Sequence, residues 1–185
     1  NDITPQQLIR SMVGREINEI YPEHKSSAGQ VLLSVRHAGR KGEFKDISFD
    51  LHSGEKLGIA GLMGAGRTEL VMALFGATKL NEGEVEVEGR PVELKSPADA
   101  IRHRIALVTE DRKFYGLNLM ASVEDNIVSV IEKKISRGGF YNKRKGKRCA
   151  EEMINKLNIK VTSPKQLTGN LSGGNQQKVV LAKWL

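Results

Sequence analysis

A glycine-rich loop constrains the fold of this chain more than any other feature. Three glycines, Gly61, Gly64 and Gly66, separate a short apolar run at Leu57–Ala60 from a helical pattern at Thr68–Phe75. We expect a buried strand, a tight turn and a helix, the context in which backbone N–H groups and a helix N-terminus bind phosphate. A structural strand-to-helix turn that binds nothing is the alternative at this point.

One position departs from the usual pattern of nucleoside-triphosphate loops, G-x-x-x-x-G-K-[ST]. Arg67 stands where the pattern has lysine, and Thr68 supplies the hydroxyl that holds Mg²⁺ in such loops. Arginine keeps the positive charge but presents a wide planar group in place of a compact ammonium. We therefore expect phosphate binding and treat the catalytic competence of the loop as a separate question.

The composition fits a globular chain with one main core and room for a small subdomain. Of its 185 residues, 39% are hydrophobic and 19 are glycine. No apolar run approaches the ~20 residues of a membrane span. The single cysteine, Cys149, excludes an intrachain disulfide, and the four histidines are scattered without metal-ligand spacing.

The net charge of +7 is concentrated in one segment. Eight basic residues and no acidic ones lie between Lys133 and Arg148. Such a run can contact nucleic acid or an anionic membrane, although a solvated face is the commoner explanation. Only Phe140 and Tyr141 are aromatic there, too few for a platform on which bases stack.

The other segments alternate between strand and helix signals. Strands are expected at 31–35, 46–51, 84–88, 91–94 and 105–108, and helices at 97–101, 120–131 and 147–157. Ser96 and Ser122 stand where N-caps belong. A short helix after Thr4-Pro5 and a linker over 21–30 precede them. The pattern predicts a parallel core flanked by antiparallel hairpins.

A second glycine-containing segment, Leu171–Gln177, opens the last predicted helix. Ser172 can cap this helix, while Gly173 and Gly174 leave its first N–H groups open to close approach. Both an anion-binding helix start and a plain N-cap fit these residues.

Together, the two glycine segments resemble the phosphate loop and signature motif of ABC transporter ATP-binding domains. The leading stretch and three motifs resemble the second ATP-binding half of bacterial ribose-, galactose- or xylose-type importers: Asn1–Pro22, Gly61–Thr68, Thr109–Lys113 and Leu171–Lys178. The resemblance implies an α/β fold of the ABC ATPase type, with a P-loop NTPase core, an antiparallel β subdomain and a helical subdomain, here incomplete. It divides the chain into a linker segment (1–30), a nucleotide-binding core (31–113) and a helical subdomain ending in the signature (114–185).

The resemblance also implies roles for individual residues. The loop that would bind ATP is Gly61, Leu62, Met63, Gly64, Ala65, Gly66, Arg67, Thr68 and Glu69. The signature that would complete the ATP site of the partner half is Leu171, Ser172, Gly173, Gly174, Asn175 and Gln176. Thr68 and Glu110 would hold Mg²⁺, and the catalytic contributions would come from Glu110, Ser172 and Gly174.

Several positions depart from the general ABC pattern. Glu110 stands where most such domains have glutamine, and Arg67 where they have lysine; both agree with the second half of this subfamily, whose loop is degenerate. Most ABC domains stack adenine on an upstream aromatic residue. The corresponding region, Arg40–Gly42, has none, and only His37 or Phe44 is nearby.

The resemblance further implies partners and a location. We expect an ATP-binding component of a sugar importer, peripheral at the cytoplasmic face of the inner (plasma) membrane. Its partners would be another ATP-binding half or a second copy, an integral membrane permease and, indirectly, a periplasmic sugar-binding protein; nucleic acid is not expected. The sequence ends eight residues after Gln177, before the metal-binding strand and switch histidine of the family. We therefore expect a truncated domain that by itself hydrolyses ATP weakly or not at all.

Two other functions remain open on sequence grounds. Ile105–Val108, followed by Glu110 and Asp111, could be the metal-binding strand of a small P-loop kinase-like phosphotransferase, although this leaves the signature-like segment without a role. The basic run could instead mark an RNA- or membrane-binding module with a vestigial glycine loop, which the sparse aromatic residues disfavour.

Overall fold

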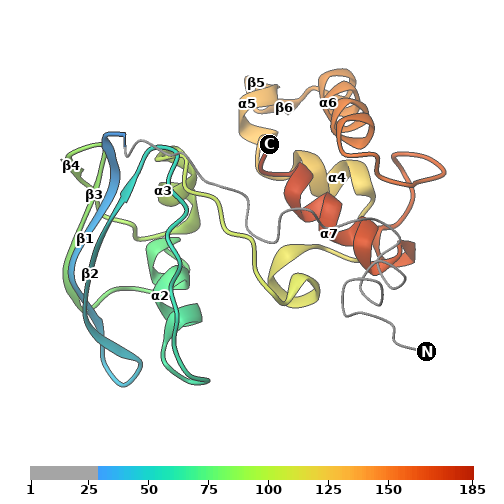
Figure 1. The fold of residues 1–185 in the computed structure, drawn as a ribbon. Helices are drawn as coiled ribbons and strands as arrows, with labels where there is room; N and C mark the ends of the chain where they lie inside the picture. Colours follow the sequence, from blue (N-terminus) through green and yellow to red (C-terminus); the bar gives the residue numbers. More distant parts are fainter. Residues whose placement is uncertain (1–28) are drawn as a thin grey trace, which may run out of the picture.

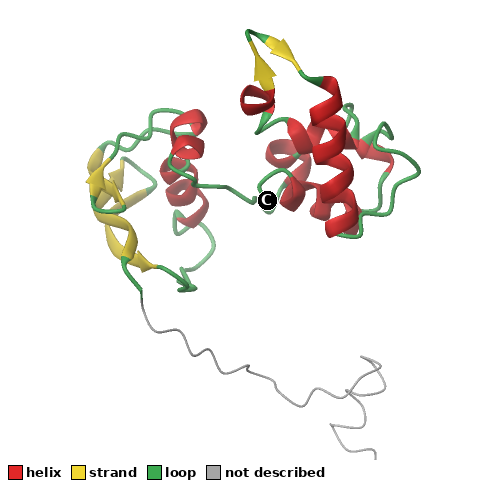
Figure 2. Cartoon of the chain, turned by 90° about the horizontal axis from the view of Figure 1, so that it is seen from above, coloured by secondary structure: helices red, strands yellow, loops and turns green. Residues whose placement is uncertain are grey.

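The computed structural model describes residues 29–185, the side chain of Arg137 excepted, and these residues form two lobes (Figure 1). One lobe is built around a sheet and the other from helices, and the view from above shows the same separation (Figure 2). The expected helix after Thr4-Pro5 and almost all of the expected linker lie outside the described residues.

The sheet lobe contains four antiparallel strands in the order β2-β1-β3-β4. They are β1 (Val31–Arg40), β2 (Phe44–His52), β3 (Glu82–Val87) and β4 (Arg90–Pro91). The register places Val35 of β1 between Phe49 of β2 and Val85 of β3. The strands predicted at 31–35, 46–51 and 84–88 are confirmed, while β4 is shorter than the predicted 91–94.

Two helices, α2 (Arg67–Leu74) and α3 (Pro97–Arg102), lie beside this sheet (Figure 1). Leu70 and Leu74 of α2 pack against Val35 and Val85, which makes a small hydrophobic cluster between helix and sheet. The predicted cap of α3 is confirmed, because the Ser96 side chain accepts a hydrogen bond from the backbone N–H of Asp99.

Two predicted strands are wrong for the described chain. Leu57–Ala60 and Ile105–Val108 have no strand pairing, and Leu57 and Ile59 are 40% and 43% exposed rather than buried. A parallel strand buried on both faces needs neighbouring strands to satisfy its backbone groups and cover its side chains. Within residues 29–185 neither segment has such a neighbour, so the expected parallel core is absent from this part of the chain.

The helical lobe follows from residue 112 onward. Its helices are η1 (Arg112–Gly116), α4 (Val123–Val128), α5 (Glu132–Ile135), α6 (Lys143–Lys156), η2 (Thr168–Asn170) and α7 (Gly173–Ala182), and its hairpin is β5 (Ser136–Arg137) and β6 (Phe140–Tyr141). The Ser122 cap of α4 is confirmed by its bond from the N–H of Asp125. The helix predicted over 120–131 is shorter than expected, and α6 begins four residues before the predicted 147.

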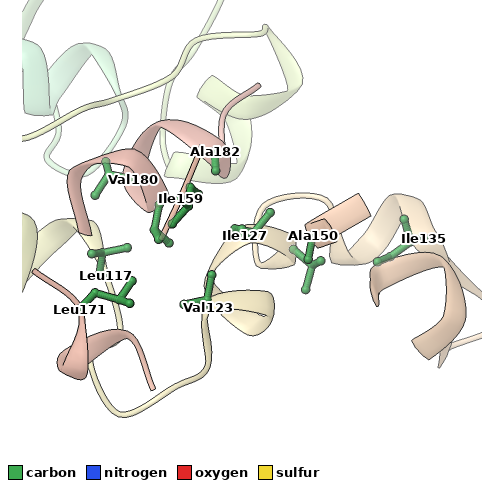
Figure 3. Close-up of a cluster of buried hydrophobic side chains, with 11 residues drawn as sticks. Leu117, Val123, Ile127, Ile135, Ala150, Ile159, Leu171, Val180 and Ala182 are labelled. Atoms are coloured by element: carbon green, nitrogen blue, oxygen red, sulfur yellow. The ribbon is translucent and has the colours of Figure 1, made fainter. Parts of the chain in front are cut away.

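Side chains from α4, α6 and α7 form the core of this lobe (Figure 3). Val123, Ile127, Val179 and Val180 are almost completely buried there. The two lobes contact each other through Phe75, after α2, and Trp184, after α7, whose rings meet edge-on at 5.7 Å. Among the described residues, no helix has both the length and the apolar character needed to cross a bilayer.

Candidate functional site

The glycine loop connects the exposed 57–60 segment to α2. Gly64 and Gly66 have φ values of 80° and 78°, in the left-handed region that favours glycine. Gly66 is also the N-cap of α2, and a Cβ there would lie 2.5 Å from the carbonyl oxygen of Glu43. The loop can therefore take this course only with glycine at position 66.

The loop presents backbone more than side chains to its surroundings. The Leu62 and Met63 side chains point into solvent, Met63 with 99% of its surface exposed. Arg67 is exposed at the first position of α2, and its guanidinium makes no ion pair with any described residue. A free cation and a helix start thus lie side by side, an arrangement that suits a polyanionic ligand.

Thr68 and Glu110 meet although 42 residues separate them in the chain. The Thr68 Oγ1 donates a hydrogen bond to Glu110 Oε1 at 3.3 Å. Both residues line a cavity of about 610 Å³, which lies within the size range of small-ligand sites. Thr109, Arg112 and Arg40 also line it, so the cavity is bordered by residues from both lobes.

Some cavity residues were not predicted, and neither adenine candidate lies there. Arg40, at the end of β1, and Tyr115, in η1, line the cavity, yet no sequence pattern singles them out as ligands. Phe44 packs against the hydrophobic cluster of the sheet lobe. His37 is exposed and bonded to Asp46 at 2.7 Å.

The signature segment begins α7 as predicted, but its serine is not bonded as expected. Ser172 has the extended backbone of an N-cap, and its side chain makes no capping hydrogen bond. The hydroxyl instead accepts a bond from Asn175 Nδ2 at 3.0 Å. Ser172, Gly173 and Gly174 are all exposed, and a Cβ on Gly174 would meet open space.

Three other signature residues anchor the segment to the helical lobe. Leu171 is buried in the core of the helical lobe. Asn175 accepts a bond from the backbone N–H of Lys160 at 2.9 Å. Gln176 is buried, with its amide donating to the carbonyl oxygens of Thr168 and Leu171. Their side chains are therefore directed into the protein, and the surface open to a ligand is Ser172–Gly174.

A buried polar network supports this segment from the inside. The Asn126 amide of α4 donates to Thr168 Oγ1 at 2.9 Å, and the Thr168 carbonyl accepts from Gln176. Gln176 Oε1 in turn accepts from Arg112 Nε at 3.1 Å. Lys183 donates to the carbonyl of Gly116 at 2.6 Å, and burial lowers the pKa of this lysine. The network connects η1 to α7. Its members are far apart in the sequence, so no local pattern predicts their contacts.

The glycine loop and the signature segment of this chain belong to different lobes (Figures 1 and 2). Arg112 connects them indirectly: it bonds to Gln176 of α7, and Glu110, two residues earlier, contacts Thr68 of α2. The segment 110–112 is thus the structural link between the two motifs.

The kinase-like alternative does not fit this geometry. The Asp111 carboxylate accepts bonds from the backbone N–H groups of Lys113 and Phe114, both at 3.1 Å, and so caps η1. Ile105–Val108 is also not a strand here.

Comparison with known proteins shows the family of this chain. The family model described as "ABC transporter" matches residues 44–185. The chain is 45% identical over 184 residues to the "Ribose import ATP-binding protein RbsA" of Lacticaseibacillus paracasei, covering all of this chain and 37% of that protein. It is 44% identical over 185 residues to a "Putative ribose/galactose/methyl galactoside import ATP-binding protein" of Geobacillus kaustophilus, with the same two coverages. The chain thus spans little more than a third of the length of these relatives.

Solved structures bear on the fold alone. An ATP-binding cassette solved as a dimer in a post-hydrolysis state with ADP and Pi matches with a TM-score of 0.65 and 19% identity, over 83% of this chain and 69% of that one. The ADP conformation of another cassette from an ABC transporter matches with a TM-score of 0.62 and 19% identity, over 84% and 65%. The predicted fold class is confirmed by these matches.

Proposed function

The chain belongs to the ABC transporter family, and from this we propose that it is part of the ATP-binding component of a sugar importer. Its relatives named for ribose and galactose import support this, because they match along the full length of the chain. Within the chain, we propose that residues 31–113 form the nucleotide-binding core and 114–185 the helical subdomain.

The contact between Thr68 and Glu110 carries this proposal. Mg²⁺ takes oxygen ligands at about 2.0–2.1 Å in octahedral geometry, which places neighbouring ligands about 2.9 Å apart. The two side-chain oxygens lie 3.3 Å apart, so a closure of a few tenths of an ångström would let both contact one ion. Magnesium usually completes its shell with water and substrate phosphate oxygens, and two protein oxygens are enough for that.

The other parts of the loop would bind the triphosphate itself. The backbone N–H groups around Gly64 and Gly66 and the start of α2 favour negative charge. Arg67, exposed and unpaired among the described residues, would add a cation beside the phosphates. Bound Mg²⁺ would offset the repulsion between Glu110 and the phosphate oxygens.

We propose that the signature segment serves a partner site instead of its own. Ser172–Gly174 is exposed at the start of α7, in the lobe that does not contain the glycine loop. We assign the chain to the second of two ATP-binding halves, with a degenerate loop, because Arg67 and Glu110 together match that half of the subfamily. Glu110, Ser172 and Gly174 would then act in catalysis only in the assembled protein, and the chain alone would hydrolyse ATP weakly.

The proposed partners follow from this assignment. They are the other ATP-binding half or a second copy, an integral membrane permease and a periplasmic sugar-binding protein, with the subunit peripheral at the cytoplasmic face of the inner membrane.

A thermal-shift experiment tests the nucleotide site. Mg·ATP at about 100 times its Kd should stabilise the chain by ~2.7 kcal/mol, which raises Tm by roughly 5–10 °C. Thr68→Val should abolish most of this shift, whereas the matched change Thr162→Val, in the helical lobe, should leave it intact.

Three results would contradict the proposal. The first is a shift that does not need Mg²⁺, and the second is stabilisation by RNA at low salt without any effect of nucleotide. The third is steady ATP turnover by the chain alone that Thr68→Ala abolishes, which would indicate a complete phosphotransferase.

A further inference from the structure

The helical lobe carries a strongly basic surface that the nucleotide site does not use. It is formed by seven exposed side chains of α5 and the first half of α6: Lys133, Lys134, Lys143, Arg144, Lys145, Lys147 and Arg148. We refer to these seven residues as the basic surface. Helices α5 and α6 pack against each other, so the seven charges lie on two neighbouring elements of the lobe.

Almost none of this charge is neutralised within the protein. Among the described residues, the only ion pair made by the basic surface joins Lys147 to Glu151, at 3.7 Å. No acidic residue occurs between Lys133 and Arg148. The surface is therefore a concentrated, open positive charge.

The position of these charges is unfavourable for the helix that carries them. The first turn of α6 has three bases, Lys143, Arg144 and Lys145, and no acid. Cations at a helix N-terminus oppose the helix dipole, where acidic residues are normally favoured. The Asn142 side chain already caps the helix by accepting from the N–H of Lys145. These charges thus oppose helix stability, which indicates that they serve a contact outside the chain.

A single exposed aromatic residue lies beside the basic surface. Phe140, in the β5–β6 hairpin, is 82% exposed, and Figure 2 shows this hairpin projecting from the helical lobe. The preceding turn contains Gly138 and Gly139, both with positive φ. Tyr141, by contrast, packs against the core of the lobe. The hairpin thus presents one apolar side chain at an edge of the charged surface.

We propose that the basic surface and Phe140 bind the surface of a bilayer rich in anionic phospholipid. Flexible lysine and arginine side chains suit a diffuse layer of phosphate headgroups, and one aromatic ring can enter the interface beside them. Single-stranded nucleic acid would require several exposed aromatic rings for stacking, and only Phe140 is exposed beside the basic surface among the described residues. This contact does not depend on the proposed nucleotide site, because no residue of the glycine loop takes part.

Vesicle sedimentation tests the proposal with the full chain. The chain should sediment with phosphatidylcholine vesicles that contain about one-third phosphatidylglycerol, and not with pure phosphatidylcholine, at low salt. Each basic residue contributes about a fivefold factor to binding, so K143Q/R144Q/K145Q should weaken it about 100-fold (~3 kcal/mol). Phe140→Ser should remove the part of the binding that persists at high salt.

A matched variant controls for net charge. K41Q/K45Q/R90Q removes three exposed charges from the sheet lobe and should leave vesicle binding unchanged. Since the three substitutions in α6 relieve an unfavourable helix start, they should not lower Tm. Thr68→Val should bind vesicles normally, which separates this proposal from the one for ATP.

Two outcomes would overturn the inference. Equal losses in the two triple variants would show that net charge alone governs binding. Tighter binding to a single-stranded RNA oligonucleotide than to the vesicles, lost in the α6 variant, would assign the surface to nucleic acid.

Discussion

Replacing Gln176 with leucine should destabilise the helical lobe, because the buried Gln176 side chain forms hydrogen bonds within the lobe. The family resemblance assigns Gln176 to the ATP-contacting signature. In the structure its side chain is buried and makes three hydrogen bonds, to Thr168, Leu171 and Arg112. Leucine has nearly the same volume, so Gln176→Leu removes the hydrogen bonds without opening a large cavity.

The size of the effect follows from the groups left without partners. The Leu171 carbonyl would lose its donor at 3.2 Å, and a buried unsatisfied polar group costs about 1–3 kcal/mol. The Thr168 carbonyl keeps the bond from the N–H of Leu171, so its loss is small. Loss of the bond from Arg112 adds about 1 kcal/mol to the destabilisation, because this half-buried guanidinium can bond to water instead. We expect a total of about 3 kcal/mol, or a decrease in Tm of roughly 6–12 °C.

Circular dichroism and hydrogen exchange together measure this prediction. Thermal unfolding should show the decrease, and faster exchange should be confined to η2, α7 and the elements that contact them, because the sheet lobe has its own hydrophobic cluster. Gln177→Leu is the matched control, since the Gln177 side chain makes no hydrogen bond to any described residue. A loss below about 1 kcal/mol for Gln176→Leu, or equal losses for both variants, would refute the reasoning.

Three further predictions concern other parts of the molecule. Lys165→Met should lower the free energy of unfolding by about 1–3 kcal/mol, because it leaves the buried carboxylate of Glu124 uncompensated while Lys165 itself is largely exposed. Adding Glu124→Gln should restore part of this stability in denaturant titrations. The hydrogen bond from Arg36 lowers the pKa of Asp50. The stabilisation of the fold by ionised Asp50 is therefore complete above the ordinary carboxyl pKa and is lost as pH falls through the lowered value. Asp50→Asn should flatten the acid side of a Tm–pH profile, and an unchanged profile would contradict this. In the proposed sugar importer, Ser172→Arg should impair sugar uptake more than Arg67→Ala does, because Ser172 is proposed to act on the partner's ATP site. Uptake that tolerates Ser172→Arg and stops with Arg67→Ala would reverse the assignment.

The sequence predicted the elements that depend on interactions between residues close together in the chain. The caps at Ser96 and Ser122 depend on residues three positions away, and the structure has both. Alternating strands such as 46–51 and 84–88 were found because each has one covered face. The glycine loop also has the positive φ values that its glycines suggest.

The wrong and missing predictions concern features that depend on residues far apart in the sequence. An apolar run such as Leu57–Ala60 predicts burial, but pairing and covering depend on strands elsewhere, which the described residues do not provide. The motif at 171–176 gave the position of the signature but not which of its side chains face inward. The bond from Arg112 to Gln176 joins residues 64 positions apart, and no periodic pattern encodes such a pairing.

A double-mutant cycle on Mg·ATP binding tests the central claim, that Thr68 and Glu110 form one nucleotide-metal site. Affinity would be measured by calorimetry for the wild-type chain, Thr68→Val, Glu110→Gln and the double variant, each with and without Mg²⁺. If both side chains contact one ion, the effects should be non-additive by about 1 kcal/mol or more, and only when Mg²⁺ is present. Additive effects, or the same coupling without Mg²⁺, would contradict the account.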